Sequence, residues 1–319
     1  MTEYARFSWT VLLPVKVLAR AKSRLAVLAG PRRCELALAL ASDTVSAVVA
    51  CPEVARVIVI TSDPVAGPRL AALGAIVVPD VAAGEQDALL AGPGGLDGPG
   101  GLGGLGGLGG LGRLGGLGGL GGPEGLGGLG GLGGLGGFGG FGGFGGFGPG
   151  LASQDGLNAA LRHGAEVAVR RWPGTGLAAL TADLPALRPG ELSAALRAVS
   201  AVTAVSAVTA VTVASAVTLS GGGADGDAGA GAARSAFVPD AARVGTTLYA
   251  VVPGGDFRPD FGGTSRMRHA AGGAIELALE DAPGIHQDVD TPTDLRAAIA
   301  LGAGHRTTAL TAELLAPDP

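Results

Sequence analysis

The chain has 319 residues, a net charge of -5, a pI near 5.4 and two cysteines. The acidic balance provides no overall basic field for nucleic acid or an anionic membrane, and two cysteines are too few for a disulfide framework or a zinc cluster. The first apolar run, residues 7–17, is short and is broken by Pro14, so neither an export signal nor a membrane span is expected. We therefore expect a cytoplasmic protein that binds neither nucleic acid nor a membrane.

Two compositionally biased tracts interrupt the chain. Residues 92–150 hold 36 of the 61 glycines as a Gly-Gly-Leu and Gly-Gly-Phe array, which leaves too few side chains to build a core. Residues 198–233 begin with an Ala-Val-Ser/Thr repeat, compatible with a helix extension or a strand, and pass into a Gly/Ala/Asp spacer. The remaining residues suffice for one domain. We expect that domain over residues 1–305, with both tracts as insertions and residues 306–319 as a tail.

Outside these tracts, short apolar runs alternate with amphipathic segments, a pattern typical of an α/β sheet. Continuous apolar strands with helices between them indicate a mainly parallel sheet covered on both faces. Ligands of such sheets bind beyond the carboxyl ends of the strands. In chain order, the predicted elements are strand 9–13, helix 32–49, strand 54–61, helix 69–73, strand 75–78, helix 157–171 and strand 177–181.

Lys16 and Lys22 are the only lysines in a chain that has twenty arginines, and both follow the first predicted strand. A lysine ammonium is a compact charge on a flexible stem, which suits a phosphate group where the planar fork of arginine does not substitute. The segment therefore indicates a phosphate-binding loop. Two surface lysines placed by chance are the alternative, and these residues alone do not decide between the two.

An acidic segment lies near the end of the predicted domain. Thr291 as N-cap, Pro292 at the first helical position and Asp294 at the third form a helix start that needs no functional explanation. Asp288 and Asp290 remain, at alternate positions of an extended stretch, and their side chains are expected on opposite faces. One of them can face a site while the other is structural.

Asp183 follows the predicted strand 177–181 within the sequence Thr181-Ala-Asp-Leu-Pro. An aspartate at this edge of a sheet is well placed to hold a divalent metal, although Asp and Pro also favour turns. A hard cation such as Mg²⁺ takes oxygen ligands, usually one or two carboxylates together with substrate phosphates. Asp183 and Asp288, from separate segments, satisfy that requirement.

Two loops rich in glycine and hydroxyl residues, 240–248 and 261–269, form a third candidate site. Small residues let backbone N–H groups approach an anion closely, and Ser265 begins a predicted helix over 265–279 whose N-terminus favours a phosphate. An ordinary turn-rich loop with a serine N-cap is the alternative. His269 is expected to be structural rather than catalytic.

Together, these segments resemble the phosphoenolpyruvate and 2-phospho-L-lactate guanylyltransferases of deazaflavin coenzyme F-420 biosynthesis. The resemblance spans about residues 10–305, with the biased tracts as insertions. The motifs that carry it are, in chain order, Pro14-Val-Lys16, Lys22-Ser-Arg-Leu25, Leu157-Asn158, Ala182-Asp-Leu-Pro-Ala-Leu187, Gly245-Thr-Thr247, Phe261-Gly-Gly-Thr-Ser265 and Asp288-Val-Asp-Thr291.

The resemblance implies a single nucleotidyltransferase domain, similar to nucleotide-diphospho-sugar transferases, with a mixed, mainly parallel sheet. It implies Mg²⁺-dependent transfer of GMP from GTP to phosphoenolpyruvate, which gives enolpyruvoyl-2-diphospho-5'-guanosine and pyrophosphate, and it leaves a homo-oligomer open. 2-Phospho-L-lactate as acceptor, a sugar-phosphate or molybdopterin-type nucleotidyltransferase, and an inactive fold with a self-associating glycine array are the alternatives.

The resemblance also implies residue roles. Lys16, Lys22, Asp183 and Asp288 would be catalytic, and the two aspartates would hold the metal. The family often has Gly-Thr-Gly-Thr where this chain has Arg243-Val-Gly-Thr246, so one glycine and one threonine are lost. The implied binding residues are Thr246, Gly262 and Ser265 for phosphoenolpyruvate, and Lys16, Lys22, Arg24, Leu157 and Asn158 for the nucleotide.

Overall fold

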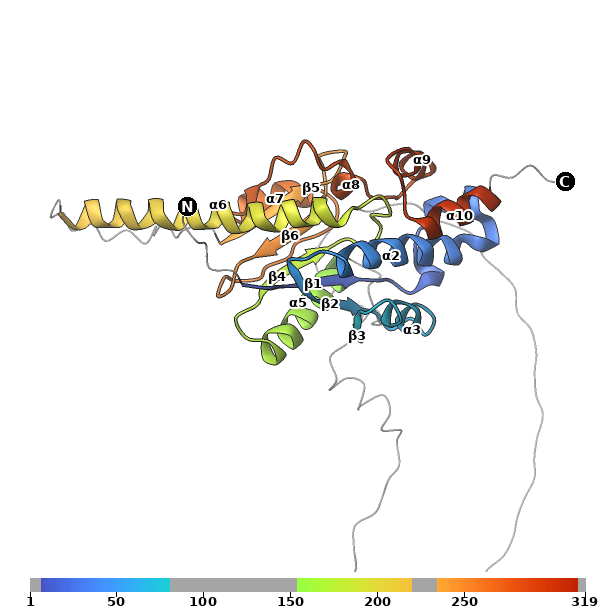
Figure 1. Ribbon diagram of the computed structural model, residues 1–319, viewed down its shortest axis with the longest axis horizontal. Helices are drawn as coiled ribbons and strands as arrows, with labels where there is room; N and C mark the ends of the chain where they lie inside the picture. Colours follow the sequence, from blue (N-terminus) through green and yellow to red (C-terminus); the bar gives the residue numbers. More distant parts are fainter. Residues whose placement is uncertain (1–6, 81–153, 220–233, 315–319) are drawn as a thin grey trace, which may run out of the picture. The chain divides into compact units, whose positions relative to one another are not determined.

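A computed structural model describes residues 7–80, 154–219 and 234–314 of the chain (Figure 1). The glycine array predicted at 92–150 and the spacer at the end of the second biased tract lie outside the described residues. All that follows concerns the described part, which belongs to one compact unit of the chain.

One seven-stranded sheet organises this unit, with strand order β3-β2-β1-β4-β6-β5-β7. Strands β1, β2, β3 and β4 run parallel to one another, β6 runs antiparallel to both β4 and β5, and β7 is parallel to β5. The predicted mixed, mainly parallel α/β sheet is therefore confirmed. The strands are β1 (Trp9–Pro14), β2 (Val54–Ile60), β3 (Ile76–Val78), β4 (Gly176–Leu180), β5 (Ser235–Pro239), β6 (Thr246–Val251) and β7 (Ile275–Glu276).

Helices cover both faces of the sheet. Side chains alternate between faces along a strand, so Val11 and Leu13 of β1 enter one core cluster while Leu12 enters the other. The helices are α1 (Ala26–Ala29), α2 (Arg33–Val49), α3 (Ala66–Ala71), α5 (Gln154–Arg171), α6 (Pro189–Leu219), α7 (Ser265–Ala271), α8 (Pro283–His286), α9 (Pro292–Ala300) and α10 (His305–Leu314).

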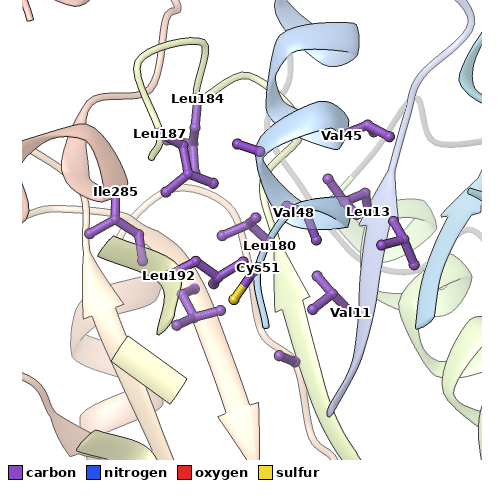
Figure 2. Close-up of a cluster of buried hydrophobic side chains, with 14 of the residues drawn as sticks. Val11, Leu13, Val45, Val48, Cys51, Leu180, Leu184, Leu187, Leu192 and Ile285 are labelled. Carbon is purple, nitrogen blue, oxygen red and sulfur yellow. The ribbon is translucent and has the colours of Figure 1, made fainter. Parts of the chain in front are cut away.

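The larger core cluster lies between the sheet and the helices α2, α6 and α8. Figure 2 shows side chains of this cluster, among them Val11 and Leu13 of β1, Leu180 of β4, Val48 of α2 and Ile285 of α8. Helix α5 covers the opposite face through residues such as Leu161, which is fully buried (Figure 1). Burial on both faces explains why the central strands consist of continuous apolar runs.

Several expectations are changed by the structure. The helix predicted over 265–279 is wrong in length, because α7 ends at Ala271 and Gly273, with φ +85°, turns the chain into β7. Helix α6 continues through residues 198–219, so the Ala-Val-Ser/Thr repeat there is helical rather than extended. Where we expected a tail, α10 begins at His305 and buries Leu310 in a cluster with residues of α2.

The chain reverses its direction of progress across the sheet between β1 and β4. From β1 the chain moves outward through β2 to β3, and it then returns to place β4 on the other side of β1. Such a switch point leaves a crevice beyond the carboxyl ends of the two strands, where open α/β sheets bind ligands. The lysine loop follows β1 and Asp183 follows β4, so the fold brings the first two candidate groups to this crevice.

Candidate active site

The loop after β1 is held in place from two sides. Arg33, at the start of α2, donates hydrogen bonds to the backbone carbonyls of Leu18, Ala19 and Ala21, the bond to Ala19 being 2.8 Å long. Asp63, just after β2, accepts a 2.8 Å hydrogen bond from the backbone N–H of Leu18. The segment that carries both lysines is therefore fixed before any ligand binds.

Lys22 lies between two carboxylates. Its Nζ contacts Asp183 Oδ2 and lies 2.8 Å from Asp290 Oδ1, and its side chain is only 13% exposed. Burial disfavours the ammonium, yet the charges of Asp183 and Asp290 raise the pKa of Lys22 above its ordinary value. Its backbone is left-handed, with φ 52°, a conformation that concentrates at functional sites in residues other than glycine. Lys22 is not one of two chance surface lysines.

Asp183 does not cap the turn that follows it. Apart from Oδ2, which contacts Lys22, its carboxylate has a buried oxygen, Oδ1, with no hydrogen-bond partner in the described part of the chain. The backbone N–H of Val289 donates a 3.1 Å bond to the Asp183 carbonyl and thereby brings the segment 288–290 alongside. An unpartnered buried carboxylate oxygen is the kind of donor that a hard cation takes.

Asp288 completes this acidic group. Burial, together with the negative charges of Asp183, Asp290 and Asp240, raises the pKa of Asp288 to about 7, against the opposing charge of Lys22. Asp290 behaves differently: burial opposes its ionisation, but Lys22, with help from Arg24 and Lys16, lowers its pKa. Both aspartates of the segment thus interact with the same centre, so the expectation that one of them is merely structural does not hold for Asp290.

Within residues 7–80, 154–219 and 234–314, no group of three or more His, Cys, Asp or Glu side chains is arranged to hold a metal ion. The ammonium of Lys22 lies between the carboxylates of Asp183 and Asp290. The donor set is nonetheless suited to Mg²⁺, because two carboxylates suffice when substrate phosphates supply further oxygens.

A cavity of about 570 Å³ opens beside this group at the carboxyl ends of β1 and β4. Its volume is in the range of small-ligand sites. Lys16 is exposed on its wall and makes no ion pair with any described residue. Among the residues that line the cavity are Lys16, Lys22, Arg24, Leu157, Leu161, Asp183, Phe261, Gly262 and Asp290.

The loops predicted to bind the acid lie next to β4. Thr181 donates its backbone N–H to the carbonyl of Thr247 at 2.9 Å, which places Thr246 beside the end of β4, close to Asp183. The backbone N–H of Arg266 donates to the Val244 carbonyl at 3.2 Å and joins the start of α7 to the same loop. Thr246 and Ser265 are nearly buried, whereas Gly262 lines the cavity.

The turn before Thr246 is built around Asp240. Its carboxylate accepts hydrogen bonds of 2.8 Å from the backbone N–H groups of Val244 and Gly245. Gly245 is required there, because a Cβ at this position would lie 2.5 Å from Asp240 Oδ2. Arg243, at the position where the family often has glycine, keeps the left-handed conformation with φ 57° and pairs with Glu276 at 2.6 Å.

The two residues predicted to lie near the nucleotide have different surroundings. Leu157 lines the cavity. Asn158 is buried, and its side-chain amide is bonded to the backbone of Phe261 in both directions: Oδ1 accepts from the N–H at 2.9 Å, and Nδ2 donates to the carbonyl at 3.2 Å. Asn158 therefore shapes the loop around Gly262, with its hydrogen-bonding groups already engaged.

Comparison with known proteins adds an independent observation. A phosphoenolpyruvate guanylyltransferase from Thermomonospora curvata is 40% identical over 315 residues, which cover 99% of this chain and 93% of that protein. Proteins of the same name from Streptosporangium roseum and Streptomyces avermitilis are 37% and 38% identical, covering 95% and 98% of this chain and 90% and 97% of their own lengths. The chain belongs to the phosphoenolpyruvate guanylyltransferase family. No family model matches it.

Among solved structures, the chain matches a protein from Desulfovibrio desulfuricans G20 that is described provisionally as a nucleotide-diphospho-sugar transferase. The match has a TM-score of 0.46 and 11% identity, and it covers 96% of this chain and 97% of that chain. Among the residues described, no helix is sufficiently long and apolar to span a bilayer.

Three residues that contact the lysine loop or Lys22 were given no role from the sequence: Arg33, Asp63 and Asp290. Arg33 and Asp63 contact the lysine loop through its backbone groups, and no sequence pattern indicates such contacts. Asp290 had a signal, its position two residues from Asp288. The prediction assumed that side chains alternate strictly between two faces along an extended segment. It did not allow for the turn that begins at Thr291, where the Asp294 carboxylate accepts hydrogen bonds from the backbone N–H groups of Asp290 and Thr291.

Proposed function

We propose that this chain transfers the guanylyl group of GTP to phosphoenolpyruvate, giving enolpyruvoyl-2-diphospho-5'-guanosine and pyrophosphate, in coenzyme F-420 biosynthesis. The observation that carries the proposal is the meeting of the lysine loop and the carboxylates Asp183, Asp288 and Asp290 beside a cavity at the β1/β4 switch point. Family membership supplies the choice of acceptor, since the relatives are named for phosphoenolpyruvate.

In the proposed reaction, an oxygen of the acceptor's phosphate attacks the α-phosphorus of GTP in line. The bond from that phosphorus to the β-phosphate oxygen breaks, and pyrophosphate leaves with the electron pair. Such chemistry requires positioning and charge neutralisation, with little covalent work for the protein. Lys16 and Arg24, on the open wall of the cavity, would bind phosphates of the nucleotide together with Lys22.

Asp183 and Asp288 are the residues that would hold Mg²⁺, and Asp290 lies close enough to join them. The buried Oδ1 of Asp183, which has no hydrogen-bond partner among the described residues, supports this assignment. When bound, Mg²⁺ supplies positive charge against the developing negative charge of the phosphates and helps to orient them. The acid would meet Thr246, Gly262 and Ser265, whose loops adjoin Asp183 and the start of α7.

The two acids that could serve as acceptor differ little in structure. Phosphoenolpyruvate and 2-phospho-L-lactate have the same size and charge, and a pocket separates such a pair by only ~1–3 kcal/mol. The names of the relatives favour phosphoenolpyruvate.

The test uses the purified full chain with Mg²⁺, GTP and each acid in turn, and measures pyrophosphate together with the guanylated product. We expect product with phosphoenolpyruvate and a loss of at least ~10²-fold in Asp183→Ala, the size of one lost electrostatic stabiliser. Asp256→Ala is the matched control, because Asp256 is an exposed carboxylate paired with Arg258 and does not line the cavity at β1 and β4. Wild-type protein without guanylyl transfer to either acid would refute the proposal.

A further inference from the structure

His269 lies in α7 against the loops proposed to bind the acid, and it is 3% exposed. Its two ring nitrogens contact different segments: Nδ1 lies 3.0 Å from Thr246 Oγ1, and Nε2 lies 3.0 Å from the backbone nitrogen of Asp260. The ring stacks on Tyr249 with centroids 4.6 Å apart and meets the edge of Phe261 at 5.3 Å. Packing and hydrogen bonds therefore fix the orientation of the imidazole.

The backbone determines which ring nitrogen carries the proton. A backbone N–H can only donate, so Nε2 of His269 accepts from Asp260. A neutral ring that accepts at Nε2 carries its proton on Nδ1 and donates it to Thr246 Oγ1. Burial lowers the pKa of His269 to about 4, with the nearby charges of Asp260 and Arg268 acting in opposite directions, so the ring is neutral near pH 7.

Thr246 is left with its own hydroxyl proton to donate. A hydroxyl has one proton and two lone pairs, and His269 uses a lone pair. Within the described ranges, the Thr246 hydroxyl has no other hydrogen-bond partner. The oxygens of a carboxylate or phosphate only accept hydrogen bonds, so they match this free proton, whereas a donor group would not.

We propose that His269 is a positioning residue for the acid substrate, because it reserves the hydroxyl proton of Thr246 for an anionic oxygen of that acid. Through Nε2 it also ties Thr246 to the loop that continues from Asp260 into Gly262. The inference rests on the proposed function, since it takes Thr246 as a ligand of the acid. His269 itself does not touch the reacting atoms in this proposal.

The loop has supports that do not depend on His269. Asn158 holds the backbone of Phe261 through two hydrogen bonds, and Arg268 donates to the Gly262 carbonyl at 2.6 Å. Gly262 and Gly263 adopt φ values of +102° and +46°, which favour glycine and limit the shapes that the loop can take. Replacing His269 should therefore alter the Thr246 hydroxyl more than it alters the loop.

Two variants separate the two bonds of His269. In His269→Gln the amide oxygen reaches the place of Nε2 and still accepts from Asp260, but the donor to Thr246 is lost. In His269→Asn the amide nitrogen takes the place of Nδ1 and still donates to Thr246. We expect His269→Gln to raise the KM for phosphoenolpyruvate about tenfold, the effect of losing one hydrogen bond to a charged group. The KM for GTP should not change in this variant. In His269→Asn, the KM for phosphoenolpyruvate should be closer to that of the wild type.

A double-variant comparison shows whether His269 acts through Thr246. Thr246→Val should raise the KM for the acid by a similar factor, and adding His269→Gln to it should cost nothing further, because the donor has already lost its partner. If the KM for the acid in the double variant rose by the product of the two single-variant factors, the inference would be overturned. An unchanged KM for the acid in His269→Gln would also overturn it.

The wild-type protein supplies a test that needs no variant to fold and no turnover. Imidazole ¹⁵N NMR at pH 7 should find His269 as the neutral tautomer protonated at Nδ1 with Nε2 as an acceptor. A ring protonated at Nε2, or at both nitrogens, would overturn the inference even in an active enzyme. Wild-type protein that shows the expected tautomer but transfers no guanylyl group would instead refute the proposed function.

Discussion

Replacing Lys22 with methionine removes the positive charge between two carboxylates while keeping the length of the side chain. The side chain of Lys22 is 13% exposed, and those of Asp183 and Asp290 are 20% and 55% exposed. Breaking a fully buried pair costs ~3–5 kcal/mol, and breaking a surface pair costs ~0–1 kcal/mol. Because one carboxylate is mostly buried and the other is half exposed, we expect Lys22→Met to lower the free energy of unfolding by about 2 kcal/mol.

Urea unfolding in the presence of a chelator measures this loss, and Lys16→Met is the matched control. Lys16 belongs to the same loop and lines the same cavity, but it is exposed and makes no ion pair within the described residues. Its replacement should change stability by no more than about 0.5 kcal/mol. The left-handed backbone at position 22 does not affect the comparison with wild type, since lysine and methionine bear the same strain there.

Adding Mg²⁺ tests whether Lys22 compensates the charge of these carboxylates. Without the ammonium, the carboxylates Asp183, Asp288 and Asp290 present uncompensated negative charge, and a divalent cation that binds only the folded state stabilises it by mass action. We expect Mg²⁺ to raise the stability of Lys22→Met by more than it raises that of wild type. Equal stability of Lys22→Met and Lys16→Met in the chelator would show that Lys22 does not compensate these carboxylates.

Three further predictions concern other parts of the site. Arg243→Gly should have a free energy of unfolding about 1 kcal/mol higher than that of Arg243→Ala in urea unfolding. Both variants lose the ion pair with Glu276, but only glycine relieves the strain of the left-handed backbone. Equal urea midpoints for the two variants would argue against strain at this position. Arg33→Met should raise the KM for GTP about tenfold and leave the KM for the acid unchanged in steady-state kinetics, since three loop carbonyls lose their donor. The pKa of His269, about 4 when folded and near 6.5 when unfolded, means that the unfolded chain binds more protons between these values. The contribution of His269 to the free energy of unfolding is therefore complete above about pH 6.5 and is lost as the pH falls toward 4, with a loss of about 2 kcal/mol at pH 5. Unfolding curves of His269→Gln measured at the same pH values should lack this loss.

The sheet and the ends of its parallel strands could be predicted because local signals and tertiary structure agree there. Strands β1, β2 and β4 are buried on both faces, and their apolar runs end at the polar residues that enter the site. Strands β5 and β6 were not predicted. In β5 only Ala236-Phe-Val238 is continuously apolar, too short a run to separate a strand from a loop. In and just after β6, residues 248–252 form a longer apolar run, a strand signal that the prediction missed.

The acidic group shows a different limit. Asp183 and Asp288 were found as carboxylates in suitable segments, but the ionisation of Asp288 depends on distances to neighbouring charges that no sequence spacing reveals. Burial and neighbouring charge raise the pKa of Asp288, whereas Lys22 lowers that of Asp290, two residues away. Residues with the same side chain thus differ electrostatically because the fold places Lys22 beside only one of them.

The choice of lysine at position 22, in a chain with twenty arginines, follows from the geometry of its contacts. An ammonium has three N–H donors, and those of Lys22 meet Asp183 and Asp290, which approach from separate segments of the chain. Among the described residues the third donor has no partner and remains for a ligand oxygen, so the same charge can hold the carboxylates together and still meet a phosphate. The planar fork of arginine directs its donors in one plane and favours a single bidentate partner. Lys16 is exposed in the same loop and makes no ion pair with a described residue, so the two lysines contribute to the site in different ways.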